Sequence, residues 1–191
     1  MGILERRQRH KTSLRRAILD SALQIVQQEG YQGVTIRRIA EAIEYSAPTI
    51  YEFFENKEML FRELKKEWLQ KMLTCIREIH AEEKEAAKAL KKIALAYAQY
   101  ALENGAHYRA VMGGENASTD FVEIHALRTV LKDSIRAIAG NNALEDKVDL
   151  FRSYLHGIVS LALAKKIPGG KDRCFNLVKE GTCVLINAWK V

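Results

Sequence analysis

The sequence has few of the residues that interrupt helices. Its 191 residues include two prolines, Pro48 and Pro168, and only eleven glycines. Runs of β-branched residues, which favour strands, are also scarce. Apolar residues instead recur every three or four positions over long stretches, which is the spacing of one helix face. These observations argue against a strand-rich fold and predict an all-α chain of about nine helices.

Cysteine is rare as well. The three cysteines, Cys75, Cys174 and Cys183, are scattered, and no cysteine pair or cysteine–histidine cluster has the spacing of a zinc site. We expect reduced thiols on helices, with no metal and no cofactor. The sequence also lacks a nucleophile elbow, a metalloprotease motif, a phosphate-binding loop and a dinucleotide fingerprint, so we expect that the chain is not an enzyme.

Long apolar runs are missing too. No segment reaches the roughly 20 apolar residues that a membrane-spanning helix needs, and the first residues are charged, unlike a signal peptide. We therefore expect a cytoplasmic protein without a membrane partner. The 30 lysines and arginines outnumber the 24 acidic residues and give a formal net charge of +6, which favours a polyanionic partner.

The stretch VTIRRIAEAIEYSAPTIYEFFENK, residues 34–57, has the pattern of two short helices joined by a tight turn. Thr35 and Ser46 can cap the two helices, and Pro48 suits a first helical turn, where its missing N–H is not needed. Apolar residues at helical spacing predict a buried side on each helix. This is the spacing of a helix-turn-helix, whose second helix can lie in the major groove of DNA.

These residues resemble the DNA-binding region of TetR-family transcriptional regulators. The most specific part is TIYEFFENKEML, residues 49–60, and the match includes Gly30 and Gly33 before the motif. The family usually has glycine at the start of the turn, where this chain has Glu44. A left-handed backbone at a residue other than glycine costs roughly 1 kcal/mol, which the motif can tolerate.

The resemblance implies a homodimer that binds a palindromic operator in double-stranded DNA, with the second helix of each motif in the major groove. Arg37 can reach a guanine edge or a phosphate, and Lys57, at a helix N-terminus, can neutralise a phosphate. The alternative is a helical hairpin with a purely structural role. Matched residue by residue to the family motif, the residues that face DNA are Arg37, Ser46, Ala47, Thr49, Tyr51, Phe53 and Lys57.

We expect two domains: a DNA-binding helix-turn-helix domain at residues 1–56, and a regulatory ligand-binding and dimerisation domain at residues 57–191. Residues 1–11 are basic and are expected to form a mobile arm that neutralises phosphates, enters a minor groove or only aids solubility. A flexible joint is expected at Gly113–Gly114. The expected helices span residues 12–29, 35–43, 47–54, 57–80, 82–103, 107–112, 118–139, 144–167 and 172–189.

The larger domain is expected to hold a mostly apolar cavity for a small lipophilic or aromatic effector. Several aromatic and polar side chains can point into such a cavity, although each of them can equally belong to the core. The candidate effector-binding residues are Tyr97, Tyr100, His107, Tyr108, Met112, Phe121, His125, Tyr154 and His156.

The last two helices, within residues 144–189, carry more apolar residues than so small a chain can cover by itself. Pairing with the same helices of a second copy would bury them in a four-helix bundle, and in the TetR family these helices form the dimer interface. His156–Gly157 also resembles the Trp…His-Gly signature of one regulatory-domain subgroup, although the tryptophan is missing. A glycine within a helix indicates close packing of another helix or approach of a ligand.

We therefore expect a sequence-specific transcriptional regulator, a repressor that a small effector releases from its operator. The effector would tilt the helix at residues 57–80 and change the spacing of the two heads, which are the DNA-binding domains of the dimer. The heads would then no longer match the two half-sites of the palindromic operator. The alternative is an architectural DNA-binding protein without a ligand. Such a protein would bind with a steep salt dependence and a specificity ratio near one.

Overall fold

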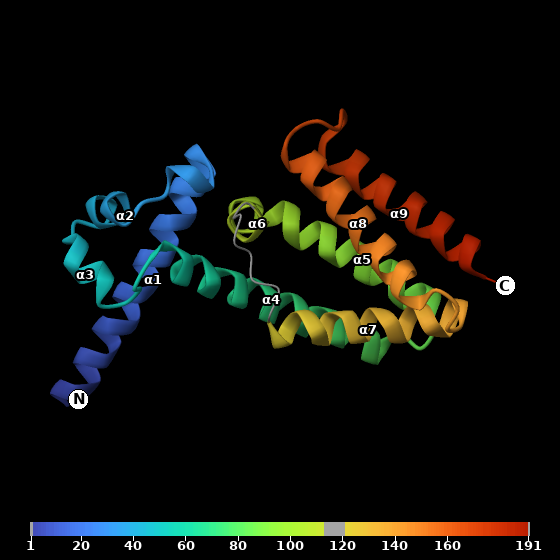
Figure 1. Ribbon diagram of the computed structural model, residues 1–191, viewed down its shortest axis with the longest axis horizontal. Coiled ribbons are helices and arrows are strands. Elements are labelled where there is room, and N and C mark those ends of the chain that lie inside the picture. The colour runs from blue at the N-terminus through green and yellow to red at the C-terminus, as the bar shows by residue number, and fades with distance from the viewer. Residues whose placement is uncertain (1, 113–120, 191) are drawn as a thin grey trace. The chain divides into compact units, whose positions relative to one another are not determined.

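The computed structural model describes residues 2–112 and 121–190, and every regular element within them is helical (Figure 1). The expected all-α class is confirmed. The joint at Gly113–Gly114 and the expected start of a helix at residue 118 lie outside the described residues. The elements are α1 (Ile3–Glu29), the 3-10 turn η1 (Tyr31–Gly33), α2 (Ile36–Ala42), α3 (Ala47–Tyr51), α4 (Lys57–Glu82), α5 (Ala86–Glu103), α6 (Gly105–Met112), α7 (Val122–Ala139), α8 (Leu144–Leu163) and α9 (Gly170–Trp189).

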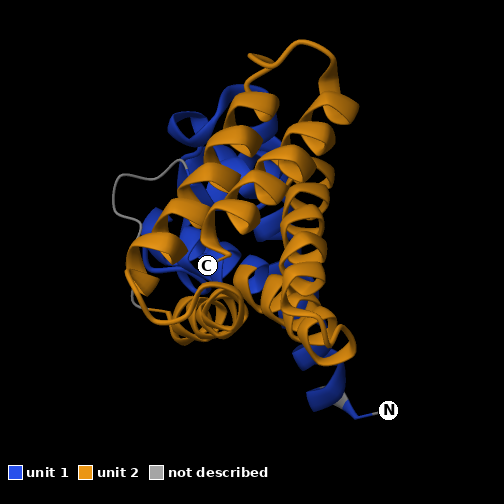
Figure 2. Cartoon of the chain, turned by 90° about the vertical axis from the view of Figure 1, so that its right-hand side faces the viewer, with its two compact units in different colours: residues 1–68, 106–118 blue, residues 69–105, 119–191 orange. Residues whose placement is uncertain are grey.

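The chain divides into two compact units, which Figure 2 shows in different colours. Unit 1 comprises residues 1–68 and 106–118, and unit 2 comprises residues 69–105 and 119–191. Helix α4 belongs to unit 1 up to Trp68 and to unit 2 from there on. The expected functional boundary after residue 56 stays a prediction.

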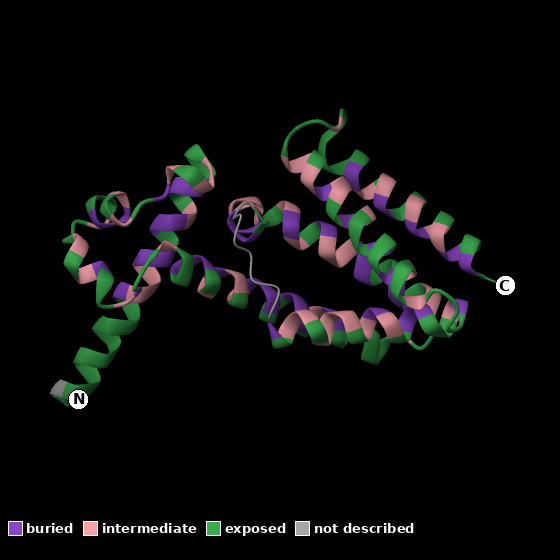
Figure 3. Ribbon diagram, viewed as in Figure 1, coloured by how far each residue is buried: buried purple, intermediate pink, exposed green. Residues whose placement is uncertain are grey.

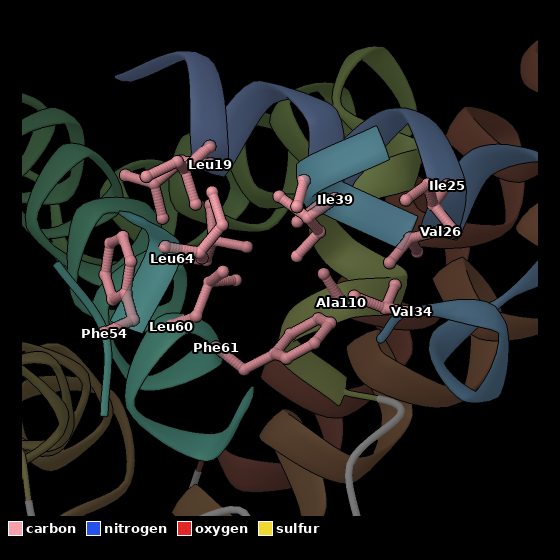
Figure 4. Close-up of a cluster of buried hydrophobic side chains, with 14 of the residues drawn as sticks. Leu19, Ile25, Val26, Val34, Ile39, Phe54, Leu60, Phe61, Leu64 and Ala110 are labelled. Atoms are coloured by element: carbon pink, nitrogen blue, oxygen red, sulfur yellow. The ribbon is translucent and has the colours of Figure 1, made fainter. Parts of the chain in front are cut away.

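The core of unit 1 joins segments that lie far apart in the sequence (Figure 4). Helices α2 and α3 have seven and five residues, too few to be stable alone, so packing of their buried side chains has to hold them. Each large apolar side chain contributes roughly 1.5–3 kcal/mol when it is fully buried. The core consists of Leu14, Ile18, Leu19, Ala22, Ile25, Val26, Val34, Ile39, Ala40, Ile50, Phe54, Leu60, Phe61, Leu64 and Ala110.

Helix α1 begins at Ile3, well before the expected start at residue 12. The backbone N–H of Gly2 donates to Oε2 of Glu5 at 3.1 Å, which caps the first turn. No glycine or proline occurs between residues 3 and 29, so nothing stops the helix from propagating toward its N-terminus. The side chains of residues 4–13 are exposed, and Leu14 is the first buried one (Figure 3). The basic segment is therefore the first part of α1 and not a separate mobile arm.

Unit 2 is centred on α5, which lies against α7, α8 and α9. The buried side of α5 includes four alanines, which allow the neighbouring helices to approach closely. Between α8 and α9, the hydroxyl of Tyr154 lies 2.7 Å from the carbonyl oxygen of Leu177 and 3.0 Å from that of Val178, and donates to this pair. A Cβ atom at Gly181 would lie 2.6 Å from Cζ of Tyr154, so only glycine leaves room for the ring.

Helix α8 ends at Leu163, earlier than the expected residue 167. The chain turns at Lys165, whose φ is +56°, and the backbone N–H of Lys166 donates to the carbonyl oxygen of Leu161 at 2.8 Å. A left-handed residue with this bond closes a helix in a Schellman motif. Glycine usually marks this position, and the lysine gave no such signal in the sequence. Within the described residues, no helix combines the length and the apolar character that crossing a membrane requires.

Candidate nucleic-acid interface

The two short helices of unit 1 start where the sequence predicts. The hydroxyl of Thr35 accepts a hydrogen bond from the backbone N–H of Arg38 at 3.2 Å, and the hydroxyl of Ser46 accepts one from Thr49 at 3.3 Å. Pro48 lies in the first turn of α3. Both predicted caps are confirmed. They fix the first turns of α2 and α3, and hence the direction in which α3 presents its side chains.

The turn between α2 and α3 is a second Schellman motif. The backbone N–H of Tyr45 donates to the carbonyl oxygen of Ala40 at 2.9 Å, and that of Glu44 donates to Glu41 at 3.3 Å. Glu44 has a φ of +59°. This is the left-handed conformation to be expected at a position where glycine is usual. The turn therefore keeps the geometry of the motif, with a backbone strain of roughly 1 kcal/mol at Glu44.

The exposed side of the motif carries Arg37 and Tyr51. The Arg37 side chain is 86% exposed, and its ion pair among the described residues is with Glu41, one helical turn later, at 2.8 Å. Tyr51 is 55% exposed, an unusual position for a large aromatic ring. Ser46 is also exposed, but its hydroxyl lies 2.9 Å from that of Thr49, so the two share a hydrogen bond.

Three other predicted residues lie closer to the core. Ala47 and Phe53 are half-buried and pack against the core of unit 1. The ammonium of Lys57 donates to the carbonyl oxygen of Tyr31 at 2.8 Å and lies 4.0 Å from the centre of the Tyr31 ring. Partial burial lowers the pKa of Lys57 from its ordinary value. Packing against Tyr31 holds this cation in place, and the sequence gave no sign of that contact.

An open groove of about 540 Å³ brings Arg37, Tyr51 and Lys57 together. It lies between the start of α2, the end of α3 and the start of α4, where Oδ1 of Asn56 accepts from the backbone N–H of Met59 at 2.8 Å. The groove could not be predicted from the sequence, because the segments that form its walls come together only in the folded unit. The predicted residues Ser46, Ala47, Thr49 and Phe53 are not part of its lining, which consists of Gln32, Val34, Thr35, Ile36, Arg37, Tyr51, Glu55, Asn56 and Lys57.

Ion pairs within unit 1 hold the motif against α1 and α4. Arg15 pairs with Glu63, and one of its N–H groups donates to the carbonyl oxygen of Phe53 at 3.2 Å. Arg38 pairs with Glu29 and lowers the pKa of that carboxyl. These side chains are 28–44% exposed, so water weakens both pairs and they contribute little to stability. Their partners are distant in the sequence, and local patterns could not reveal them.

The residues predicted to bind an effector fall in both units. In unit 1, His107 and Tyr108 are buried: Nε2 of His107 lies 2.7 Å from the carbonyl oxygen of Leu64, and Tyr108 packs edge-on against Trp68 at 6.1 Å. Met112 is 40% exposed. None of the nine candidates lines the groove described above.

In unit 2, Tyr154 contacts the backbone of α9 through its hydroxyl. Among the other predicted effector residues of unit 2, burial differs widely, and their role stays a prediction. No group of three or more histidine, cysteine or acidic side chains in the described part of the chain is placed to hold a metal ion. Phe121 is buried, Tyr97 and Tyr100 are half-buried, and His125 and His156 are exposed.

Comparison with known proteins finds two family models that match different parts of the chain. Residues 18–64 match the model of bacterial regulatory proteins of the tetR family, and residues 90–180 match that of a tetracyclin repressor-like C-terminal domain. The chain is 25% identical over 155 residues to YobS of Bacillus subtilis, an uncharacterized HTH-type transcriptional regulator, and this covers 75% of the chain and 76% of YobS.

A shorter match covers the helix-turn-helix region. It is 43% identical over 56 residues to the HTH-type transcriptional repressor ComR of Escherichia coli, covering 29% of the chain and 27% of ComR. Among solved structures, the TetR-family regulator PfmR of Thermus thermophilus superimposes with a TM-score of 0.70 at 17% identity, over 89% of this chain and 97% of PfmR. The superposition supports the fold, and the two family models give the order of the domains.

Proposed function

The chain belongs to the TetR family of bacterial regulatory proteins and is a DNA-binding transcriptional regulator. From this premise we propose that it is a homodimeric repressor, and that a small lipophilic or aromatic effector releases it from a palindromic operator. The two helix-turn-helix motifs of the dimer would enter successive major grooves, about 34–36 Å apart on one side of the duplex. The exposed pair Arg37 and Tyr51, beside the open groove, is the observation that carries the proposal.

Arg37 is suited to bind DNA because little holds it in the free protein. In the described part of the chain its ion pair joins residues four apart on a helix surface, with side chains 86% and 61% exposed, and such a pair is worth about 0.3–0.5 kcal/mol. A bidentate contact between arginine and a guanine edge discriminates by about 1–3 kcal/mol. Exchanging Glu41 for a base or a phosphate is therefore favourable. Tyr51, which lines the same groove, would contact a phosphate or a base edge.

The start of α4 supports phosphate binding at the same groove. The first backbone N–H groups of a long helix attract anions, and α4 runs for 26 residues from Lys57. Lys57 donates one of its three protons to Tyr31, so two remain for a phosphate. Contacts of this kind set the register of the protein on the duplex, while Arg37 and α3 read its sequence.

The homodimer is proposed to form through α8 and α9, within residues 144–189. Leu150 and Leu161 on α8 and Val184 on α9 are 51%, 47% and 65% exposed. Among the described residues, a Cβ atom at Gly157 would meet nothing within 4 Å beyond its own stretch of helix. Packing within residues 2–112 and 121–190 therefore does not explain a glycine at this helical position, whereas the close approach of a second copy of α8 would. This supports a helical bundle between two copies.

The proposal also states that the protein represses transcription and that an effector releases it from its operator. The name of ComR, a repressor, supports the sign of the regulation. A small molecule can release the operator only if it binds one spacing of the two heads better than the other. We expect that a compound from a panel of long-chain acyl and aromatic molecules that raises the melting temperature of the protein also weakens operator binding. If every stabilising compound left operator affinity unchanged, the switch would be refuted.

The DNA proposal is tested by selecting bound duplexes from a random pool, which yields the half-sites and their spacing. Arg37→Ala and Tyr51→Ala should each abolish binding to the selected operator while the circular dichroism spectrum is unchanged. Arg77→Ala, on an exposed part of α4 in unit 2, is the charge-matched control and should bind normally. Full binding by both motif variants would refute the assignment, and a specificity ratio near one for the parent protein would favour an architectural role.

A further inference from the structure

The first turns of α1 form a basic helix that lies outside the core. Residues 4–13 carry four arginine or lysine side chains and a single acid, Glu5. All ten side chains are exposed, and Figure 1 shows the segment continuing to the N-terminus past α3 within unit 1. Because these side chains do not pack in the core, the concentration of positive charge in residues 4–13 is not explained by folding, and a binding partner is the alternative explanation.

One row of side chains along α1 begins beside the residues that follow α3. Arg7, Lys11 and Arg15 are spaced four residues apart, so they lie on the same side of α1. The guanidinium of Arg15 lies 4.5 Å from the centre of the Phe54 ring, and the ammonium of Lys11 lies 6.0 Å from that of Phe53. Arg7 continues this row by one turn beyond the core.

The charges along the row differ in one respect. Glu63 neutralises Arg15, whereas within residues 2–112 and 121–190 no carboxylate lies within 4.0 Å of Arg7 or Lys11. Two cations without carboxylate partners therefore extend from the end of α3 along a rigid helix. Their Cα atoms are about 6 Å apart along the helix axis, whereas successive phosphates of one DNA strand advance about 3.4 Å. The two side chains can thus reach different phosphates of one strand.

We propose that Arg7 and Lys11 bind the phosphates of the DNA strand that borders the groove occupied by α3. The inference rests on the proposed function, since α3 has to occupy that groove. The helical form of the segment also selects among its possible targets. A helix with side chains is about 10–12 Å wide, whereas the minor groove is about 6 Å wide. The segment therefore lies along the backbone and does not enter the minor groove, and it adds affinity without reading sequence.

The test is the salt dependence of binding by the full-length protein, measured on a selected operator duplex and on an unrelated duplex. In Arg7→Gln/Lys11→Gln, the slope of log affinity against log salt concentration should become shallower by about 0.9 for each lost phosphate contact, or by up to about 3.6 for a dimer. The specificity ratio should not change. Glutamine is a good helix former, so the circular dichroism spectrum should be retained.

The matched control is Arg6→Gln/Arg9→Gln, which removes the same charge from the opposite side of the same helical turns and should alter the slope much less. An equal effect of the two double variants would overturn the proposal, because the contact would not depend on the face of the helix. So would an unchanged slope in Arg7→Gln/Lys11→Gln, or a changed preference for flanking bases, which would indicate minor-groove reading. The unrelated duplex keeps the test valid even if the parent shows no operator preference, an outcome that would instead refute the proposed function.

Discussion

Replacing Gly181 on α9 or Gly157 on α8 by alanine is expected to change the stability of the protomer in opposite directions, although both glycines lie inside helices of the same unit. In an exposed helix interior, replacing glycine by alanine stabilises the protein by about 1 kcal/mol. At Gly181 the added methyl would lie 2.6 Å from Cζ of Tyr154. The ring would have to move and give up its hydroxyl contacts with the carbonyls of Leu177 and Val178. The hydroxyl has one proton, which the two carbonyls share, and leaving a buried polar group without its partner costs about 1–3 kcal/mol. At the middle of that range the loss exceeds the gain in helix propensity.

We therefore expect Gly181→Ala to lower the free energy of unfolding by about 1 kcal/mol, because a cost of roughly 2 kcal/mol for the unsatisfied hydroxyl is only half offset by the gain in helix propensity. Urea unfolding at several protein concentrations measures this change and separates it from dissociation of a dimer. Removing the ring should reverse the sign, so that Gly181→Ala becomes stabilising in a Tyr154→Ala background. A Gly181→Ala protein more stable than the parent would refute the packing of Tyr154 on α9.

At Gly157 the added methyl meets nothing within 4 Å among the residues that the structure describes, apart from its own helix. Gly157→Ala should therefore stabilise the isolated protomer by about 1 kcal/mol. If a second copy of α8 approaches there, the same methyl overpacks the interface at a cost of about 1–3 kcal/mol, which is about 5–150-fold in the dimer dissociation constant. Sedimentation equilibrium measures that constant. An unchanged value would refute the close approach at Gly157 while leaving the prediction for Gly181 intact.

Two further predictions concern backbone strain and charge. Glu44→Gly should raise the free energy of unfolding by about 0.5–1 kcal/mol, because the strain energy relieved at the left-handed residue exceeds the entropic cost of ordering a glycine. Glu44→Ala is the control, since alanine does not relieve the strain. A glycine variant less stable than the parent in urea unfolding would contradict the reasoning. The guanidinium of Arg128 lowers the pKa of Asp149, so Asp149 contributes stability that is complete above its ordinary pKa of about 3.9 and is lost as the pH falls through the lowered folded-state value. Arg128→Gln should therefore lose less stability than the parent between about pH 5 and pH 2, as measured by thermal unfolding; an identical loss in both proteins would argue against the pair.

Local chemistry made the helix-turn-helix predictable. Thr35 and Ser46 cap their helices through bonds that span three residues, and Glu44 stands where a glycine is usual. Each of these features depends on a few neighbouring residues, so the sequence pattern contains nearly all of the information. The charge and the spacing of the motif then indicated DNA as the partner before any fold was known.

Predictions failed where distant contacts or missing signals decide the structure. The contact between the ammonium of Lys57 and Tyr31, 26 residues earlier, was not predictable from local sequence, and the DNA contact of Lys57 stays a prediction. The end of α8 was placed too late because Lys165 adopts the left-handed conformation without the usual glycine. The start of α1 was placed too late because a helix without breakers propagates beyond the point where its apolar stripe ends. Tyr154, a candidate for the effector, contacts the backbone of α9 as well, and its role toward an effector stays a prediction.

The contact between His107 and Leu64 spans 43 residues and has a consequence for how the chain folds. The DNA-binding unit is completed by α6, whose Tyr108 covers Trp68 and whose Ala110 closes the core. A chain that ended after residue 68 would leave this side of the unit open to water. During synthesis the same surface stays uncovered until the ribosome has released residues beyond 110, so nascent chains pass through a period in which chaperones have an apolar surface to bind.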